Sequence, residues 1–309
     1  MHSLLLSIST VHAGAIAALL AALLWGGGDF AGGFATKRGS PLQIIAIAQG
    51  LDVLLLIATC LWLHTPLPST TALLWGFGGG LLNGLGLICL YTALAMAEMG
   101  LAAALAGLLT AALPVIADVF IEGPPTPLQL LGFLLAAVAI WRIASAPSDA
   151  PASVQKRSLI LASLAGLGFG LFLICSRQAS REALLWPLLV SRAAGVGVAL
   201  LLLAVYRRDS GALPEARHQQ STIRAVIAWQ PLTPAVIWLG IVAGVLDLAG
   251  NLLYMWATEV GRMDVAAVLA SLYPASTILL ALVLLRERPT RGQGFGMALA
   301  MVALLLIAR

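Results

Sequence analysis

Residues 23–40 read LLWGGGDFAGGFATKRGS, an apolar run that is interrupted by glycines and by Asp29 and closed by two cations. A glycine-rich loop that binds phosphate needs GxGxxG or GxxxxGK[ST] between a strand and a helix, and neither spacing occurs in this stretch. The remaining interpretation is a transmembrane helix whose small residues let neighbouring helices approach closely. The stretch therefore predicts a helical membrane protein with a carboxyl group inside the bilayer.

The composition supports this interpretation. Of the 309 residues, 61% are hydrophobic and only 10% are charged, and the mean hydropathy is +1.00. A soluble domain carries roughly 25% charged residues. The lipid bilayer is therefore the first expected partner. The net charge of +4 comes mainly from loop residues and indicates no nucleic-acid partner.

Ten segments are long and apolar enough to span a bilayer, which takes about 20 residues in a helix that satisfies its own backbone hydrogen bonds. The predicted spans are 13–36, 42–64, 71–97, 101–121, 127–145, 158–178, 184–206, 234–258, 263–285 and 291–308. Two connections are long: the polar linker 147–157 and the segment 207–233, in which residues 223–229 suggest a short amphipathic surface helix. The predicted fold is an all-α integral membrane protein with ten transmembrane helices.

The two halves of the chain repeat each other. Glu98-Met-Gly before the fourth span recurs as Glu259-Val-Gly before the ninth, and the segment 122–132 resembles 287–296. Each half has five spans, an odd number, so the second half must be inverted relative to the first. Inverted repeats place a solute site at their interface near the midplane, as in secondary transporters. We predict two five-helix repeats at 1–146 and 158–309, joined by the linker 147–157.

A family resemblance agrees with this architecture. The run LASLYPAST at 269–277 and the run LLRERPTRGQ at 284–293 resemble the EamA-type branch of the drug/metabolite transporter superfamily. Two further motifs resemble sequences of the same branch: Trp25-Gly26 followed by Asp29-Phe30, and Asp247 followed by Asn251. The resemblance implies a ten-helix carrier that moves metabolites, amino acids or drugs across the cytoplasmic membrane without ATP. Pro114 and Pro274 lie at different distances from the glutamates that follow them, so the repeats should kink differently.

Polar residues inside the spans are candidates for the solute pathway, because an ionisable group in the bilayer interior costs about 2.5–3.5 kcal/mol on insertion scales. The eighth span has one polar face, formed by Asp247, Asn251, Tyr254 and Thr258. The third span has a looser one, formed by Asn83, Tyr91 and Glu98. The alternative to a place in the pathway is that both polar faces form a packed hydrogen-bond network between helices.

Charged residues in other spans complete the set. Arg192 needs a carboxylate such as Asp247 or Asp52, or an anionic group of the solute. Asp29 either lies in the pathway or pairs with a cation near the interface. A carboxyl group that carries a coupled proton needs burial, and Asp247, Asp29 and Asp118 are the candidates. The residues Glu98, Glu259, Glu122 and Glu287 lie at span boundaries, where caps or other structural roles are expected for them.

Aromatic residues offer a second kind of contact. Trp25, Tyr91, Tyr254, Trp256 and Tyr273 could form a wall that suits apolar or cationic solutes. The alternative is interfacial anchoring, which we expect for the tryptophans near span ends. No cofactor and no metal site are expected: the three cysteines lie in apolar segments without CxxC spacing, and the histidines are scattered.

We expect a secondary active transporter, not an enzyme, because HExxH and GxSxG are absent. Its expected solute is a small organic metabolite such as an amino acid, or a drug, with export as the expected direction. The alternative function is that of an uptake carrier for a sugar or a quaternary amine. A function of a different class is that of a membrane channel or receptor. The expected partners are the bilayer, the solute and, for a coupled carrier, protons, and the expected state is a monomer or homodimer.

The charges of the loops predict the orientation. With the N-terminus inside, the outer loops would hold most of the basic residues: Lys37, Arg38, Arg142, Lys156, Arg157, Arg207, Arg208, Arg217, Arg224, Arg286, Arg288 and Arg291. The inner face would hold only Arg177, Arg181, Arg262 and Arg309. The positive-inside rule therefore favours both termini outside.

Overall fold

The computed structural model describes residues 2–122, 126–145, 151–209, 229–260, 269–270 and 272–307, and all regular structure in these ranges is helical. The first half contributes α1 (His2–Thr36), α2 (Pro41–Trp62), α3 (Thr70–Met96), α4 (Met99–Glu122) and α5 (Pro127–Ser145). The second half contributes α6 (Ala152–Ser180), α7 (Leu185–Asp209), α9 (Pro234–Val260), α11 (Tyr273–Leu284) and α12 (Arg291–Ile307). These ten helices confirm the predicted all-α fold.

Six of the described helices are long and apolar enough to cross a membrane: α1 from Ala13, α2, α3, α6, the Leu185–Val205 part of α7, and the Pro234–Ala257 part of α9. The helices α4, α5, α11 and α12 contain shorter apolar stretches. Most helix bounds agree with the predicted spans to within a few residues. The suggested surface helix at 223–229 falls almost wholly outside the described residues.

Three predicted helix starts differ from the structure. The helix α1 begins at His2, although its apolar span begins at Ala13 as predicted. The helix α6 begins at Ala152, well before the expected residue 158, so part of the predicted linker is helical. The ninth span was expected as one helix over 263–285, but α11 begins at Tyr273, after a turn at Leu272. Pro274 explains this start, because proline lacks an N–H group and fits the first helical turn. Pro114 lies inside α4 instead, so the two prolines differ as expected.

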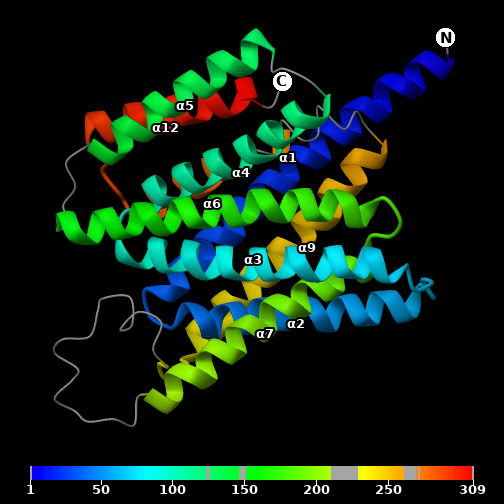
Figure 1. Cartoon of the computed structure of the whole chain (residues 1–309), viewed down its shortest axis with the longest axis horizontal. Coiled ribbons are helices and arrows are strands. Elements are labelled where there is room, and N and C mark those ends of the chain that lie inside the picture. Colours follow the sequence, from blue (N-terminus) through cyan, green and yellow to red (C-terminus); the bar gives the residue numbers. More distant parts are fainter. Residues whose placement is uncertain are drawn as a thin grey trace.

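The helices pack in a pattern that is preserved when the two halves are exchanged. The helix α1 packs along α9, and their counterparts α6 and α3 pack along each other in the same way. Three further pairs join a helix to its own counterpart: α2 with α7, α4 with α11, and α5 with α12. Figure 1 shows α5 and α12 together at one edge of the molecule and α2 and α7 near the opposite edge. This arrangement is that of two related five-helix units packed face to face.

The repeat extends to individual hydrogen bonds. At the start of α5, the Thr126 N–H donates to Gln129 Oε1 at 2.9 Å, and the Gln129 N–H donates to Thr126 Oγ1 at 3.2 Å. At the start of α12, Thr290 and Gln293 make the same two bonds at 2.7 and 3.3 Å. Each pair is a reciprocal capping box, which satisfies two N–H groups that the helix leaves free.

The glycine-rich part of α1 lies in the middle of the bundle. A Cβ atom at Gly26 would collide with Ser276 and with the backbone of Tyr273 in α11. A Cβ atom at Gly32 would collide with the ring and hydroxyl of Tyr91 in α3. The absence of side chains at these two positions is therefore what allows three helices to meet. The residues 23–36 form a closely packed transmembrane helix, as the sequence predicted.

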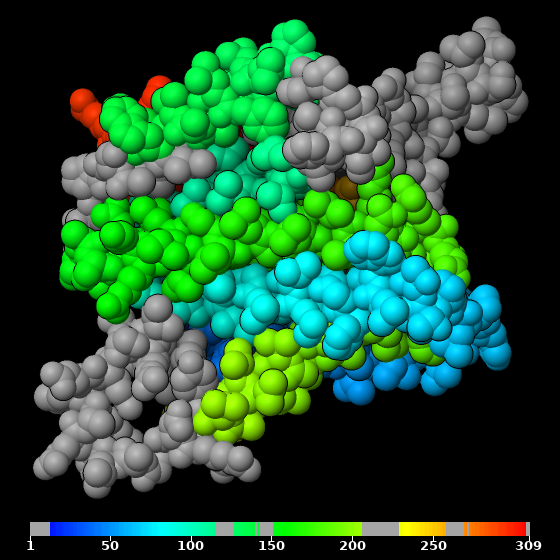
Figure 2. Space-filling view, in the orientation of Figure 1, coloured from blue at the N-terminus to red at the C-terminus, as the bar shows by residue number. Residues whose placement is uncertain are grey.

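The outside of the bundle is apolar. Large apolar side chains such as those of Leu54, Leu61, Leu74, Leu201 and Val283 are exposed, as are the rings of Trp62, Trp141 and Trp238. In Figure 2, α3 and α6 lie side by side across the middle of one face, with α7 below them. The buried core is rich in alanine, as expected where transmembrane helices pack closely without a hydrophobic driving force between them.

Candidate functional site

A small polar cavity lies where α1, α2, α3 and α9 meet. Its lining comprises Trp25, Gly28 and Asp29 from α1, Ala48, Gln49 and Asp52 from α2, Leu87 and Tyr91 from α3, and Ala243, Gly244 and Asp247 from α9. Three helices of the first half and one of the second half thus form its walls. The cavity has room for about one ordered water molecule in this conformation. A larger solute would enter only if the helices separated.

Arg192 of α7 joins two of these carboxyl groups. Its Nη2 lies 2.7 Å from Asp247 Oδ2, and its Nε lies 3.7 Å from Asp52 Oδ2. The side chain of Arg192 is 2% exposed and that of Asp52 is 1% exposed, whereas that of Asp247 is 36% exposed. Arg192 therefore holds together a first-half and a second-half residue behind the cavity wall. Asp247 also lines the cavity.

Two residues of α2 are buried with unused hydrogen-bonding capacity. Gln49 is 2% exposed, and neither its amide nitrogen nor its amide oxygen has a hydrogen-bond partner. The two carboxylate oxygens of Asp52 also lack hydrogen-bond partners, apart from the long ion pair with Arg192. Buried polar groups are nearly always satisfied, so each exception needs an explanation. Both residues line the cavity, which makes a bound molecule the simplest explanation.

Aromatic rings border the cavity on one side. The Trp25 ring lies 5.5 Å from the Tyr254 ring and 6.4 Å from the Tyr273 ring, the second pair in an edge-on geometry of 87°. The Tyr273 hydroxyl donates to Thr110 Oγ1 at 3.5 Å. Trp25 also packs against the backbone at Gly250, where a Cβ atom would collide with its ring. The rings come from α1, α9 and α11, so both halves of the chain contribute to this aromatic cluster.

The structure brings together most of the pathway residues predicted from the sequence. Trp25, Asp29, Tyr91 and Asp247 line the cavity, Arg192 contacts two of its carboxyl groups, and Tyr254 packs on Trp25. Two others lie outside the lining. Asn83 is buried in α3 with its amide nitrogen unpartnered, and Asn251 donates to the Asp247 carbonyl at 2.7 Å within α9. Asp118 lies in α4, and its side chain is outside the described residues.

Sequence reasoning missed Gln49 and treated Asp52 only as a partner for Arg192. The two residues lie three positions apart, so they share one face of α2. Both are polar in a span that is otherwise strongly apolar. The rule that polar residues in a span face the protein interior would have found them.

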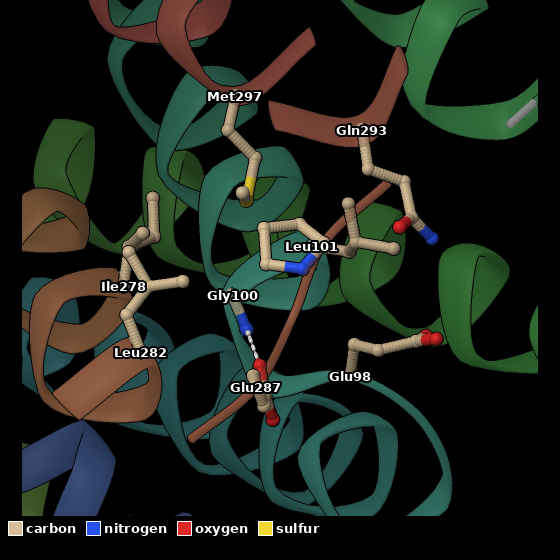
Figure 3. A pocket seen from close by; sticks show the side chains of 9 residues that line it. Glu98, Gly100, Leu101, Ile278, Leu282, Glu287, Gln293 and Met297 are labelled. Carbon is tan, nitrogen blue, oxygen red and sulfur yellow. Dashed lines mark hydrogen bonds between the residues drawn. The ribbon is translucent and has the colours of Figure 1, made fainter. Parts of the chain in front are cut away.

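A second, smaller pocket lies at one end of the bundle, at the junction of α4, α11 and α12. Glu98, Glu287 and Gln293 are its polar lining residues, as Figure 3 shows. Glu287 Oε1 accepts a hydrogen bond from the Met99 N–H at 2.9 Å, and Oε2 accepts one from the Gly100 N–H at 3.3 Å. The Glu287 carboxylate thus caps the N-terminus of α4 from the other half of the chain. This contact is the structural role expected for Glu287.

Hydrogen bonds join the two halves of the chain at both ends of the α2–α7 region. At one end, Ser69 donates its N–H and its hydroxyl to the two carboxylate oxygens of Glu182, and Trp186 Nε1 donates to the Thr65 carbonyl at 3.1 Å. At the other end, Gln43 Nε2 donates to the Gln230 carbonyl, and the Gln230 N–H donates to Gln43 Oε1, both at 3.0 Å. These contacts therefore join the first half of the chain to the second at both ends of α2.

The described lining of the cavity offers carboxyl groups, a phenol, an amide and aromatic rings, which are the kinds of group that hold small ligands in proteins. Within the parts of the chain that the structure describes, no group of three or more histidine, cysteine, aspartate or glutamate side chains could hold a metal ion.

Comparison with known proteins identifies relatives of this chain. The profile of the EamA-like transporter family matches residues 12–145 and again 156–309. A solved structure described as "Crystal structure of protein" has a TM-score of 0.58 and 17% sequence identity, and the match covers 95% of each chain. At that identity the similarity concerns the fold alone. A search of curated proteins finds no match.

Proposed function

Because this chain belongs to the EamA-like transporter family, we propose that it is a secondary active transporter that moves a small organic solute by alternating access. It is a multi-pass membrane protein. We place it in the cytoplasmic membrane, as a monomer or homodimer, with export as its direction. The proposed solute class is an amino acid or related metabolite, or a drug. The paired matches 12–145 and 156–309 support our division into repeats at 1–146 and 158–309 with a linker between them.

The observation that carries this proposal is the buried ionic cluster at the junction of the two halves. Arg192 and Asp247 come from the second half, whereas Asp29 and Asp52 come from the first. Ionisable groups in the bilayer interior are costly and tend to serve solute or ion pathways. In carriers built from inverted repeats, the solute binds where the repeats meet, and rocking of one repeat against the other opens it to each side.

The small cavity fits one stage of such a cycle. Hydrogen bonds at both ends hold the halves together, through Glu182 and Ser69 on one side and through Gln43 and Gln230 on the other. Each of these contacts joins the first half to the second. Breaking one set while keeping the other would open the cavity to a single side of the membrane. This is the motion that alternating access requires.

Coupling to protons is part of the proposal. Asp29 and Asp247 line the same cavity, and Asp247 is accessible there, so both carboxyl groups are in reach of water and of a solute. A proton bound on one of these groups and a solute bound beside it would compete for the same negative charge. Such competition is the simplest form of exchange between a solute and a proton. Asp118 remains the third candidate for a coupled proton.

A thermal-shift screen of the purified protein tests this function. The panel contains amino acids, sugars, nucleobases, polyamines and quaternary amines, and it is repeated with Asp247→Asn. A solute that stabilises the wild type but not the variant would support a carrier with its site on α9. The matched control is Gly78→Ala, because a Cβ atom at Gly78 meets nothing within 4 Å. Hits that are unaffected by Asp247→Asn would contradict the assignment of the site.

A further inference from the structure

We propose that the cavity selects solutes with a protonated amine, that is, organic ammonium ions with N–H groups to donate. This inference rests on the proposed transport function and assigns the chemical class of its substrate. Four features of the site carry it: the balance of charge, the unpartnered amide of Gln49, the aromatic cluster at Trp25, and the engagement of Arg192.

Acidic side chains outnumber basic ones at the cavity. Asp29, Asp52 and Asp247 line it, and the lining includes no lysine, arginine or histidine. Arg192, behind the wall, is the cation that the structure places against them. Arg192 pairs with Asp52 and Asp247, whereas Asp29 has no ion pair with a described cation. A cation that enters the cavity can therefore pair with Asp29 in its ionised form.

Arg192 is not free to bind an anionic solute. Its Nη2 contacts Asp247 at 2.7 Å, its Nε faces Asp52, and its side chain is 2% exposed. A carboxylate solute would have to displace one of these aspartates and would then lie beside the remaining ones. Like charges at such distances repel strongly in a medium of low dielectric constant. The site therefore disfavours anions.

Gln49 indicates what the cation must look like. Its amide oxygen and nitrogen are both unpartnered, and the residue is 2% exposed and lines the cavity. A buried acceptor without a donor costs about 1–3 kcal/mol. A protonated amine has several N–H groups, so it can donate to the Gln49 oxygen and to an aspartate of the same lining. A quaternary ammonium ion has no N–H and would leave the amide oxygen unsatisfied.

The aromatic cluster supplies the remaining contact. The Trp25 ring lines the cavity, and the rings of Tyr254 and Tyr273 support it at 5.5 and 6.4 Å. An ammonium group or its adjoining methylene groups gains from the face of a tryptophan ring. Asp29 follows Trp25 by four residues, so the carboxylate and the ring lie on the same face of α1. The two residues together form one side of an ammonium site.

The test uses sets of compounds that differ only at nitrogen. Butylamine and 2-phenylethylamine are compared with their N-acetyl derivatives, their N,N,N-trimethyl derivatives and the corresponding alcohols, by thermal shift and by uptake into proteoliposomes. We expect the amines to bind roughly tenfold or more tightly than the neutral analogues, as for a charge-assisted hydrogen bond. We expect the trimethyl compounds to bind more weakly than the amines, because they cannot donate to Gln49.

Variants of two lining residues locate the effect. Asp29→Asn should weaken binding of the amines and leave the weak binding of the alcohols unchanged. Gln49→Leu should remove the preference for amines over trimethyl compounds. Gly78→Ala serves as the folding control. Should a variant fail to fold, the ranking of compounds on the wild-type protein still decides the question.

The outcomes separate this inference from the transport function. Equal binding of amines and alcohols, or no binding of either amine, would overturn the ammonium site. Transport of a sugar or a carboxylate that depends on Asp247 would also overturn the ammonium site, but it would support the proposed transport function. Binding of amines without exchange across proteoliposomes would support the site and contradict the carrier instead.

Discussion

Arg192 Nη2 lies 2.7 Å from Asp247 Oδ2 while the Nε of the same side chain faces Asp52 across 3.7 Å, so one buried guanidinium ties α7 to α2 and α9. The three helices come from both halves of the chain. Because Arg192 and Asp52 are almost fully buried, neither can exchange its partner for water without a movement of the helices. The cluster thus ties these three helices together beside the candidate site.

Arg192→Met should destabilise the protein strongly, since it leaves the buried Asp52 without a cation. Breaking a buried pair by removing one partner costs about 3–5 kcal/mol. Thermal unfolding in detergent measures the loss. Combining Arg192→Met with Asp52→Asn should recover part of it, because the buried charge is then removed as well. Additive losses in the double variant would contradict the pairing.

Gly32→Ala should be destabilising, because the new Cβ atom collides with the Tyr91 ring. Overpacking of a tight interior costs about 1–3 kcal/mol. Adding Tyr91→Leu should relieve part of the strain. Gly78→Ala is the matched control, and its effect should lie between neutral and about 1 kcal/mol stabilising, as for glycine replaced in a helix. Equal melting temperatures for Gly32→Ala and Gly78→Ala would show that α1 and α3 do not meet here.

Glu287→Ala should loosen the start of α4. The variant loses both hydrogen bonds to the Met99 and Gly100 N–H groups, and loss of an N-terminal cap costs about 1 kcal/mol. Faster hydrogen exchange at these two amides is the expected readout. Arg288→Ala, in the same loop and exposed, is the control. Unchanged exchange at both amides would argue against the cap.

Glu182 should make stability depend on pH. Hydrogen bonds from the Ser69 hydroxyl and N–H lower the pKa of its carboxyl group below the ordinary value for glutamate. A group with a lowered folded pKa contributes stability that is present above its unfolded pKa, about 4.3, and is lost as the pH falls through the folded value. The melting temperature of the wild type should exceed that of Glu182→Gln at pH 7, and the gap should close on acidification. A gap that is constant or grows as the pH falls would contradict this account.

The orientation can be checked with fusion reporters. The basic loop residues predict that both termini lie outside the cytoplasm. A reporter that is active only in the periplasm should therefore work when it is fused after Arg309. A fusion at the same residue that is active in the cytoplasm would reverse the topology.

Much of the fold was predictable because the bilayer leaves few choices. Lipid provides no hydrogen-bond partners, so apolar segments of sufficient length must be helices. The repeated Glu-x-Gly signal and the resemblance of segment 122–132 to segment 287–296 then identified the two halves. The start of α11 at Tyr273 was missed because hydropathy runs through the turn at Leu272 without a change.

The site was predictable only in part. The cost of burying charge pointed to Asp29, Arg192 and Asp247, and the structure brings them around one cavity. Asn83 and Asn251 lie on polar helix faces too, but helix rotation and packing decide which polar residue reaches the cavity. Asn251 instead uses its amide within its own helix. Which polar residues reach the cavity depends on contacts between helices, and the sequence of a single span does not determine these contacts.

The central claim is that the cavity at Asp247 belongs to a carrier, and counterflow tests it most directly. Proteoliposomes are loaded with an unlabelled solute whose stabilising effect depends on Asp247, and the labelled form is added outside without any imposed gradient. The account predicts a transient accumulation of label above equilibrium in the wild type and its loss in Asp247→Asn. Simple equilibration without an overshoot in the wild type would contradict alternating access and indicate a channel.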